Sequence, residues 1–270
     1  MTIEQIKQPI INEYSQFQEY FHRYTDTRVE LLDQVIEYLG QFPGKQLRPI
    51  MVLLAAKACG HYEHRHALLA TAVEMLHNAS LMHDDVIDES DSRRNHDSVC
   101  HRWSNQVAVL SGDYFLAQVM AIVQEVGDST ISNLLSHTVS VMCQGELQQL
   151  ASIHNNISEE SYIDIIGAKT ASLLATCCEF GASTFDGSEA PYRKALRDFG
   201  YHYGVVFQIR DDINDFNSEH DVALPAGASA ESLINKHTQL AIEALAPLPP
   251  SEAKEVLLAM LHPSAPQPVC

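Results

Sequence analysis

Two short acidic clusters contain the side chains best suited to chemistry in this sequence. Both follow the pattern Asp-Asp-x-x-Asp, and their members are Asp84, Asp85, Asp88, Asp211, Asp212 and Asp215. On a helix, residues i, i+1 and i+4 lie near one face, so we expect the three carboxylates of each cluster to converge. Buried, clustered carboxylates tend to become protonated, whereas Mg²⁺ accepts oxygen ligands and often shares them with substrate phosphates. The pair of clusters predicts a site for several Mg²⁺ ions around a diphosphate, although either cluster alone could be a solvated acidic helix face.

Residues before each cluster could serve the same site. His77 precedes Asp84 by seven residues and shares its helix face, and Gln208 precedes Asp211 by three. Gly204, one helical turn before Gln208, would let a neighbouring helix come close. Considered singly, His77 would be a buried core histidine and Gln208 an ordinary polar contact. Their position beside the aspartates favours roles in substrate binding.

The elements that must position these residues are predicted to be helices. No proline occurs between Pro49 and Pro191, and apolar residues recur there at helical spacing, with no clear alternation typical of strands. We expect helix breaks near Gly60, Asn95, Gly127, the stretch HNNISEES and Gly187. After residue 216 the composition becomes small and polar, which predicts a loop followed by two short helices. The fold class is therefore all-α, in a single domain over residues 1–270 with a core of about residues 20–216.

Composition limits the function further. The chain has 270 residues, 46% of them hydrophobic, and a formal charge of −18 from 17 basic and 35 acidic residues. This excess of acids argues against a general nucleic-acid binder, because phosphate neutralisation needs cations. We find no signal-peptide pattern and no uninterrupted apolar run of transmembrane length. Six cysteines without a CxxC pair are typical of a cytoplasmic protein with reduced thiols.

Six segments between Phe42 and Phe216 resemble, in order, the motifs of the trans-prenyltransferase family, the polyprenyl diphosphate synthases. They are PGKQLRP, EMLHNASLMHDDVIDESDSRR, VLSGDYFLA, GEL, KTASLL and GVVFQIRDDINDF. The resemblance implies an isoprenoid-synthase-type helical bundle around a deep central cavity. It also implies Mg²⁺-dependent, head-to-tail condensation of isopentenyl diphosphate with an allylic diphosphate. Homodimers formed through long helices are common in this family.

The resemblance also implies roles for individual residues. Mg²⁺ would be bound by Asp84, Asp85, Asp88, Asp211 and Asp212, with Asp215 more loosely involved. Isopentenyl diphosphate would be bound by Lys45, Arg48, His77 and Arg94. The allylic diphosphate would contact Arg93, Lys169, Thr170 and Gln208, with Lys169 and the aspartates acting on its departing diphosphate. Arginine suits these positions because its planar fork can bond two oxygens at once.

Product length is predicted from the two residues at the fifth and fourth positions before the first cluster. Family members that make short products often carry an aromatic residue there, whereas this chain has Ala79 and Ser80. On a helix these residues lie roughly 6–8 Å from Asp84, so small side chains would leave a tunnel open. We therefore expect a medium- or long-chain product. Alternatively, Ala79 is only a tight contact between helices.

The sequence departs from the family pattern in three places. Gln46 stands where the family usually has arginine, and Asn95 where it usually has glycine, although asparagine tolerates the left-handed conformation. After the second cluster the family has a lysine-bearing loop, but no Lys or Arg occurs here between Arg210 and Lys236. The chain could thus be a compact active enzyme, a weak or regulatory subunit of a heteromeric prenyltransferase, or a sequence lacking an internal segment. A class I terpene cyclase is disfavoured, because position 222 is valine where the cyclase metal motif has glutamate.

Overall fold

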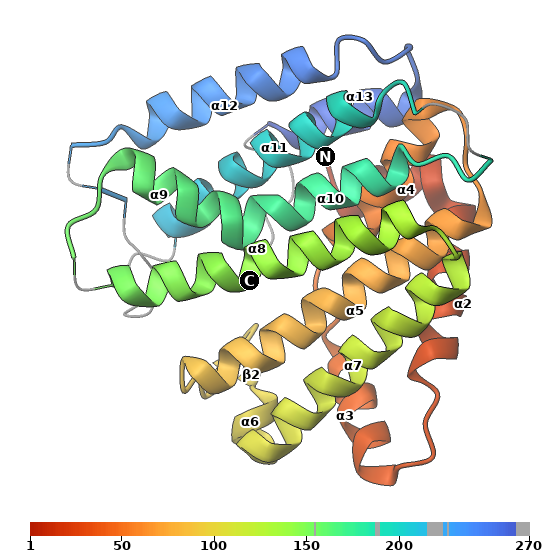
Figure 1. Cartoon of the computed structure of the whole chain (residues 1–270), viewed down its shortest axis with the longest axis vertical. Helices are drawn as coiled ribbons and strands as arrows, with labels where there is room; N and C mark the ends of the chain where they lie inside the picture. The colour runs from red at the N-terminus through yellow and green to blue at the C-terminus, as the bar shows by residue number, and fades with distance from the viewer. Residues whose placement is uncertain (154, 187–189, 215–223, 226, 263–270) are drawn as a thin grey trace.

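The computed structural model of the chain describes residues 1–153, 155–186, 190–214, 224–225 and 227–262. Within these residues it is an almost entirely helical bundle (Figure 1). The elements up to and including the helix that carries the first acidic cluster are α1 (Ile3–Lys7), η1 (Gln8–Ile10), α2 (Ile11–Thr25), α3 (Glu30–Gln41), α4 (Leu47–Cys59) and α5 (His64–Ile87). Those after it are β1 (Ser92–Arg93), β2 (His96–Asp97), α6 (Val99–Arg102), α7 (Asn105–Val126), α8 (Ser129–Ser152), α9 (Glu159–Ile166), the π-helical turn η2 (Gly167–Ala171), α10 (Ser172–Gly181), α11 (Arg193–Asn214), α12 (Ala230–Ala244) and α13 (Glu252–Met260). The predicted all-α class is confirmed.

Most predicted helix breaks correspond to helix ends with identifiable caps. α4 and α7 end at Gly60 and Gly127, which both adopt the left-handed conformation that glycine allows without steric cost. Ser158, in the stretch HNNISEES, caps α9 by accepting a hydrogen bond from the Ser161 backbone N–H. The break expected at Gly187 lies outside the described residues.

A two-stranded hairpin contains the only strands in the described part of the chain. β1 and β2 pair antiparallel, and the turn between them is formed by Arg94 and Asn95, with φ of 54° and 63°. Strands of two residues are too short to show an alternating pattern, so the sequence did not predict them. The expected left-handed conformation of Asn95 is confirmed, and its consequence is that Arg93 and Arg94 are held beside the end of α5.

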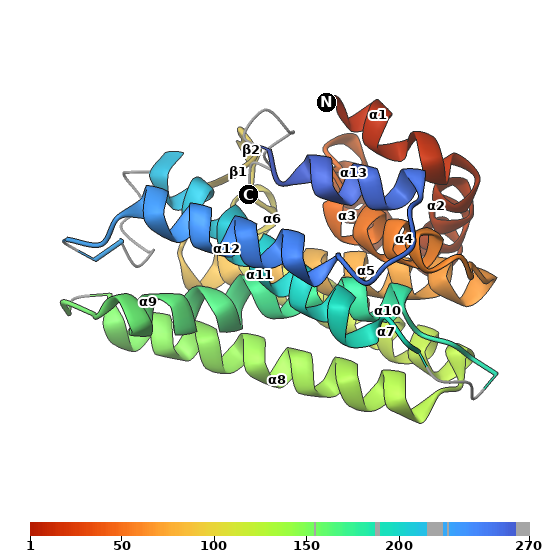
Figure 2. The same ribbon diagram turned by 90° about the horizontal axis from the view of Figure 1, so that it is seen from above.

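α5 is the central helix of the bundle. It packs against α2, α4, α7 and α10, and α10 in turn contacts α4 and α11 (Figures 1 and 2). Because α5 is covered on several sides, its first 16 positions include an almost continuous buried run from His66 to His77. Such a helix cannot show a simple amphipathic stripe. α5 and α11, which carry the two acidic clusters near their C-terminal ends, run toward the same end of the molecule (Figure 1).

The C-terminal helices predicted after the polar loop are present. α12 packs along α11, and α13 packs on α4, so the final described helix returns to the N-terminal half of the bundle (Figure 2). Arg210, next to the second acidic cluster, donates a 2.9 Å hydrogen bond to the backbone carbonyl of Leu261 just beyond α13. This contact ties the end of the described chain to the helix that carries the second cluster.

α7 is the one helix among the described residues that is long and apolar enough to cross a membrane by length and composition. Such a test does not distinguish a spanning helix from a core helix, and α7 packs along α5 and contains Asp113 and Glu125. None of the five cysteines within the described ranges forms a disulfide.

α11 approaches the α10 segment closely because two glycines replace side chains at the contact. A Cβ atom at Gly204 would lie 2.6 Å from Cα of Ala171, and one at Gly200 would lie 2.5 Å from the backbone oxygen of Leu174. Both distances are shorter than van der Waals contact, so any larger residue would push the helices apart. The close approach expected at Gly204 is confirmed.

Replacing this glycine tests the contact. We expect Gly204→Ala to lower the free energy of unfolding by about 1–3 kcal/mol, because the added methyl group meets backbone atoms. Gly40→Ala is the control, since a Cβ there meets nothing within 4 Å; it should be neutral or stabilising by up to about 1 kcal/mol. Denaturant unfolding measures both, and equal stabilities would contradict the tight contact.

Candidate active site

The first acidic cluster lies where α5 ends. Asp84 and Asp85 are in its last turn, and Asp88 is its C-cap residue. The pKa of Asp84 is raised to about 7, chiefly by burial and also by the nearby carboxylates of Glu146 and Asp88, while Lys169 and Arg93 act in the opposite direction. Asp84 therefore sits in a mixed group of acids and cations drawn from four segments of the chain.

Lys169, predicted to contact the allylic substrate, faces this group from η2. Its ammonium lies 3.0 Å from the Glu146 carboxylate on α8. The two elements can meet because residue 145 is glycine: a Cβ atom there would lie 2.7 Å from the backbone nitrogen of Lys169. Glu146 was not among the predicted site residues, although the segment GEL that contains it was part of the family resemblance. Single π-helical turns such as η2 occur frequently at functional sites.

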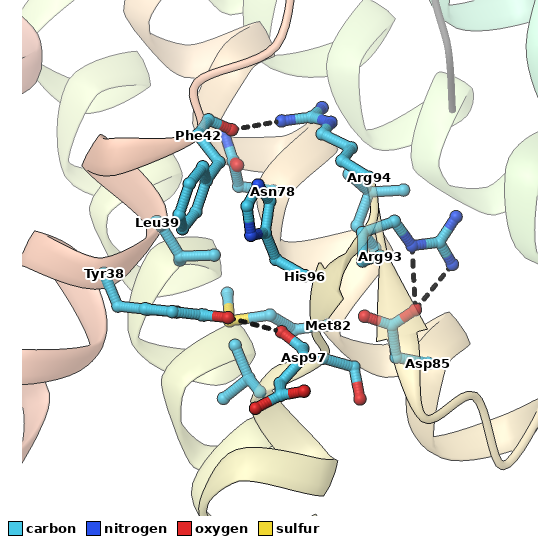
Figure 3. Close-up of a pocket in the computed structure, with 13 residues that line it drawn as sticks. Tyr38, Leu39, Phe42, Asn78, Met82, Asp85, Arg93, Arg94, His96 and Asp97 are labelled. Atoms are coloured by element: carbon cyan, nitrogen blue, oxygen red, sulfur yellow. Dashed lines mark hydrogen bonds and ion pairs between the residues drawn. The ribbon is translucent and has the colours of Figure 1, made fainter.

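Asp85 has a different environment from Asp84. It is 3% exposed, and its Oδ1 accepts hydrogen bonds of 2.9 and 2.5 Å from the Arg93 guanidinium (Figure 3). Burial raises the pKa of Asp85, and the ion pair with Arg93 opposes the rise. The predicted allylic-site arginine and the second aspartate of the cluster are thus joined to each other. This pair fixes the β1–β2 hairpin against α5.

The second acidic cluster is held by a chain of hydrogen bonds. Thr170 donates to Gln208 Oε1 at 2.7 Å, and Gln208 Nε2 donates to Asp212 Oδ1 at 2.7 Å. The hydroxyl of Tyr162, a fully buried residue on α9, donates to the other oxygen, Asp212 Oδ2. Three predicted site residues are therefore brought together, and Tyr162 joins them without having been predicted. Asp215 lies outside the described residues.

The residues predicted to bind isopentenyl diphosphate form a cationic group beside the hairpin. Burial lowers the pKa of His77 well below its usual value, and Arg48, Arg94 and Arg93 lower it further. Burial and the three nearby guanidinium groups thus all favour the neutral form of the His77 imidazole. The Arg94 guanidinium also donates to the Phe42 carbonyl at 2.9 Å, as Figure 3 shows.

Lys45 links this cationic group to the second acidic cluster. It lies in the turn between α3 and α4 and is partly buried. Burial lowers the pKa of Lys45, while the carboxylate of Asp211 acts to raise it. Lys45 is thus within electrostatic range of Asp211, although the two residues lie more than 160 positions apart in the sequence.

A buried carboxylate lies beneath the cationic group. Glu74 is 2% exposed, and burial raises its pKa to about 7, while Arg48, Arg94, Asn78 and Lys7 act to lower it. Its Oε2 atom has no hydrogen-bond partner. The sequence offered a signal for this residue, because Glu74 is a single acid within the apolar run LLATAVEML.

The two predicted chain-length positions differ in their surroundings. Ala79 is fully buried and belongs to the main hydrophobic core. Ser80 is partly exposed, and its hydroxyl donates to the His77 carbonyl at 2.9 Å. Because Ser80 precedes Asp84 by four residues, the two share a helix face.

The described carboxylates fit a metal ion only in part. No group of three His, Cys, Asp or Glu side chains within the described ranges converges on one point, because Asp85 pairs with Arg93 and Asp212 with Tyr162 and Gln208. The three-carboxylate convergence expected at the end of α5 is therefore not present in this structure. Asp84 is the best remaining ligand: a divalent cation would remove the repulsion from Asp88 and Glu146 that raises its pKa.

Comparison with known proteins agrees with the helical fold. The sequence model of the polyprenyl synthetase family matches residues 29–267, so the chain belongs to that family. An all-trans-nonaprenyl-diphosphate synthase (geranyl-diphosphate specific) of Rhodobacter capsulatus is 36% identical over 81% of this chain and 67% of its own length. Component 2 of a heptaprenyl diphosphate synthase of Geobacillus stearothermophilus is 38% identical over 73% of this chain and 62% of its own length.

The structural comparison extends over almost the whole chain. A polyprenyl synthase from Caulobacter crescentus CB15, crystallised with calcium and isoprenyl diphosphate, superposes with a TM-score of 0.89 at 25% identity, covering 96% of each chain. The sequence alignments, in contrast, span about two thirds or less of the length of the curated relatives. The family and the isoprenoid-synthase fold are established by these matches.

Titration of Glu74 is predicted to affect stability. The folded pKa of about 7 lies above the ordinary value of 4.5, so between these pH values the folded protein keeps a proton that the unfolded chain has lost. The free energy of unfolding should therefore fall as the pH rises from about 4.5 to about 7, by on the order of 1–3 kcal/mol from this group. In Glu74→Gln the share of this decrease that comes from residue 74 should be absent, so the pH dependence should be weaker than that of the wild type, while Asp84, whose pKa is also raised to about 7, still contributes. The control is Glu37→Gln, at an exposed position on α3, and urea unfolding over this pH range is the measurement; identical pH dependence of wild type and Glu74→Gln would contradict it.

Proposed function

We propose that the chain is a prenyltransferase that condenses isopentenyl diphosphate with an allylic diphosphate to make a medium- or long-chain all-trans polyprenyl diphosphate. The observation that carries the proposal is the juxtaposition of a cationic group (Arg48 and Arg94, beside His77) with acidic groups on α5 and α11. Guanidinium groups whose charge is not fully neutralised by nearby carboxylates can bind a diphosphate. Carboxylates beside them can bind the metal ion that accompanies a second diphosphate. The relatives named as nonaprenyl and heptaprenyl synthases support the long-chain product.

In the proposed reaction the C–O bond of the allylic diphosphate breaks, and diphosphate leaves with the electron pair. The double bond of isopentenyl diphosphate attacks the allylic carbon, and loss of a proton restores a double bond. Lys169, Thr170 and Gln208 would position the allylic diphosphate, while Arg48, Arg94 and Lys45 would hold the isopentenyl diphosphate. The apolar residues that cover α5 would exclude water, which would otherwise quench the cationic carbon.

We propose that Mg²⁺ is held by Asp84 and Asp88, with Asp211 serving the second cluster. When bound, the ion neutralises charge that develops on the departing diphosphate. Asp85 and Asp212 would act differently, because Arg93, Tyr162 and Gln208 already hold their carboxylates in place. These two aspartates would orient the groups around the ion.

Substituting Asp84 tests the activity. Asp84→Asn should lower kcat for elongation of farnesyl diphosphate by isopentenyl diphosphate at least about 100-fold, because it removes a charge that the transition state depends on. Asp91→Asn is the matched control: Asp91 follows the same helix end, but its side chain is 85% exposed and contacts His101, so activity should be retained. Products are measured by chain length with Mg²⁺ present. Absence of elongation by the wild type, together with equal substrate binding by Asp84→Asn, would refute an elongating enzyme.

Product length should respond to Ser80. Ser80→Phe places an aromatic ring about 6 Å along α5 from Asp84, where it would block the growing chain. The variant should make shorter polyprenyl diphosphates than the wild type at a similar rate of first condensation. The control is Ser132→Phe, a partly buried site on α8 far along the chain from the cluster. An unchanged product distribution in Ser80→Phe would place the tunnel elsewhere.

The alternative proposal is a subunit of a heteromeric prenyltransferase. It is favoured by the relatives named as component 2 of heptaprenyl diphosphate synthases. Assembly, with a copy of itself or with a second chain, is supported by exposed apolar side chains on α7 and α8: Leu110, Met120 and Leu147 are 66–72% exposed. A chain that is inactive alone but changes the rate or product length of a partner synthase would establish this alternative.

A further inference from the structure

Lys7, the last residue of the N-terminal helix α1, is connected to the proposed diphosphate site by hydrogen bonds. α1 is short and is fixed at its start by a capping box between Thr2 and Gln5. At its end, the Lys7 ammonium is partly buried: it donates a 2.8 Å hydrogen bond to the Tyr14 hydroxyl and lies 4.0 Å from the centre of the Tyr14 ring. An ammonium group that loses hydration on burial needs compensating contacts. The hydrogen bond and the ring contact supply them, so they favour this one position of the Lys7 side chain.

Tyr14 connects Lys7 to the turn that precedes α4. Its ring is 5% exposed, and its hydroxyl donates to Gln46 Oε1. Gln46 is the N-cap residue of α4 and has the left-handed φ of 50°, which is uncommon for a residue other than glycine. Lys45 and Arg48 flank it in the sequence. The hydrogen-bonded chain Lys7–Tyr14–Gln46 therefore joins α1 to the turn that presents both of these cations.

Lys7 also lies within electrostatic reach of the buried Glu74. Burial lowers the pKa of Lys7, and the carboxylates of Glu4 and Glu74 oppose that shift. Glu74 is surrounded by Arg48, Arg94 and, more weakly, Lys7. A carboxylate shared among three cations neutralises only part of their charge, so a net positive potential remains for an anion.

We propose that Lys7 is a positioning residue of the isopentenyl diphosphate site, which holds the Lys45–Arg48 turn through Tyr14 and Gln46 and adds positive charge beside Glu74. This inference rests on the proposed function. It also accounts for the glutamine at position 46, where the family resemblance leads one to expect arginine: the charge is supplied by α1, and the glutamine carbonyl connects it to the turn. The ligand class is a diphosphate monoester or inorganic pyrophosphate.

The experiment measures the dissociation constants of inorganic pyrophosphate and of isopentenyl diphosphate for the full chain by calorimetry. Lys7→Met and Tyr14→Phe should each weaken binding roughly three- to tenfold, the size expected when one partly screened charge or its link is removed. Lys7→Arg should bind almost as the wild type does. Adding Gln46→Arg to Lys7→Met should recover most of the lost affinity, because the charge then comes from the turn itself.

Steady-state kinetics separates positioning from general damage. Lys7→Met should raise KM for isopentenyl diphosphate by a similar factor, with kcat and KM for the allylic substrate little changed. Lys57→Met is the matched control, because Lys57 also ties the N-terminal helices to α4, through a 2.8 Å ion pair with Glu13 on α2, but is not part of the chain to Gln46. Its pyrophosphate affinity should equal that of the wild type.

Either of two results would overturn the role of Lys7 while leaving the proposed function intact. In the first, Lys7→Met binds pyrophosphate as tightly as the wild type. In the second, Lys7→Met and Lys57→Met weaken pyrophosphate binding equally, and Gln46→Arg does not restore it. Arg48→Met identifies failure at the level of the proposed function. If Arg48→Met binds isopentenyl diphosphate normally, the cationic group is not its site, and the role of Lys7 fails with it. If Arg48→Met is impaired while Lys7→Met is not, only the role of Lys7 is refuted.

Discussion

Charged side chains that are buried inside a helical bundle need partners, and this requirement organises the site. A carboxylate removed from water is destabilised unless cations or hydrogen-bond donors surround it. Asp85 is compensated by Arg93, Asp212 by Tyr162 and Gln208, and Glu146 by Lys169. Except for the Gln208–Asp212 contact within α11, each of these partnerships joins two different elements, so the electrostatic need also fixes the packing around the proposed substrates.

Two carboxylates remain only partly compensated, and they differ in position. Burial raises the pKa of both Asp84 and Glu74 to about 7. Asp84 lies at the end of α5 among other acids, where an added cation would stabilise it. Glu74 lies ten residues earlier, where its carboxyl group is close to the guanidinium groups of Arg48 and Arg94. The end of α5 is thus rich in carboxylates, and about three turns earlier the same helix places Glu74 among the guanidinium groups of Arg48 and Arg94.

Close helix contacts make these partnerships possible. Gly145 lets α8 reach η2, so that Glu146 meets Lys169, and Gly204 lets α11 reach Ala171, so that Gln208 meets Thr170. Side chains at either glycine would separate the backbones by more than a hydrogen bond tolerates. Packing and chemistry are therefore coupled: the same small residues that fill the core tightly also determine which polar groups can touch.

The helical class, most of the helix ends and the family could be predicted from the sequence alone, because helical periodicity, capping residues and short motifs are local patterns. The sequence also identified Lys45, Arg48, His77, Lys169, Thr170, Gln208 and the aspartates as candidate site residues. Which of them are in contact depends on the tertiary structure: the Asp85 carboxylate pairs with Arg93, and the Tyr162 hydroxyl donates a hydrogen bond to Asp212. Helix packing likewise brings Glu74 and Lys7 to the cationic group, since contacts between residues 20 or more positions apart leave no local periodic signal in the sequence.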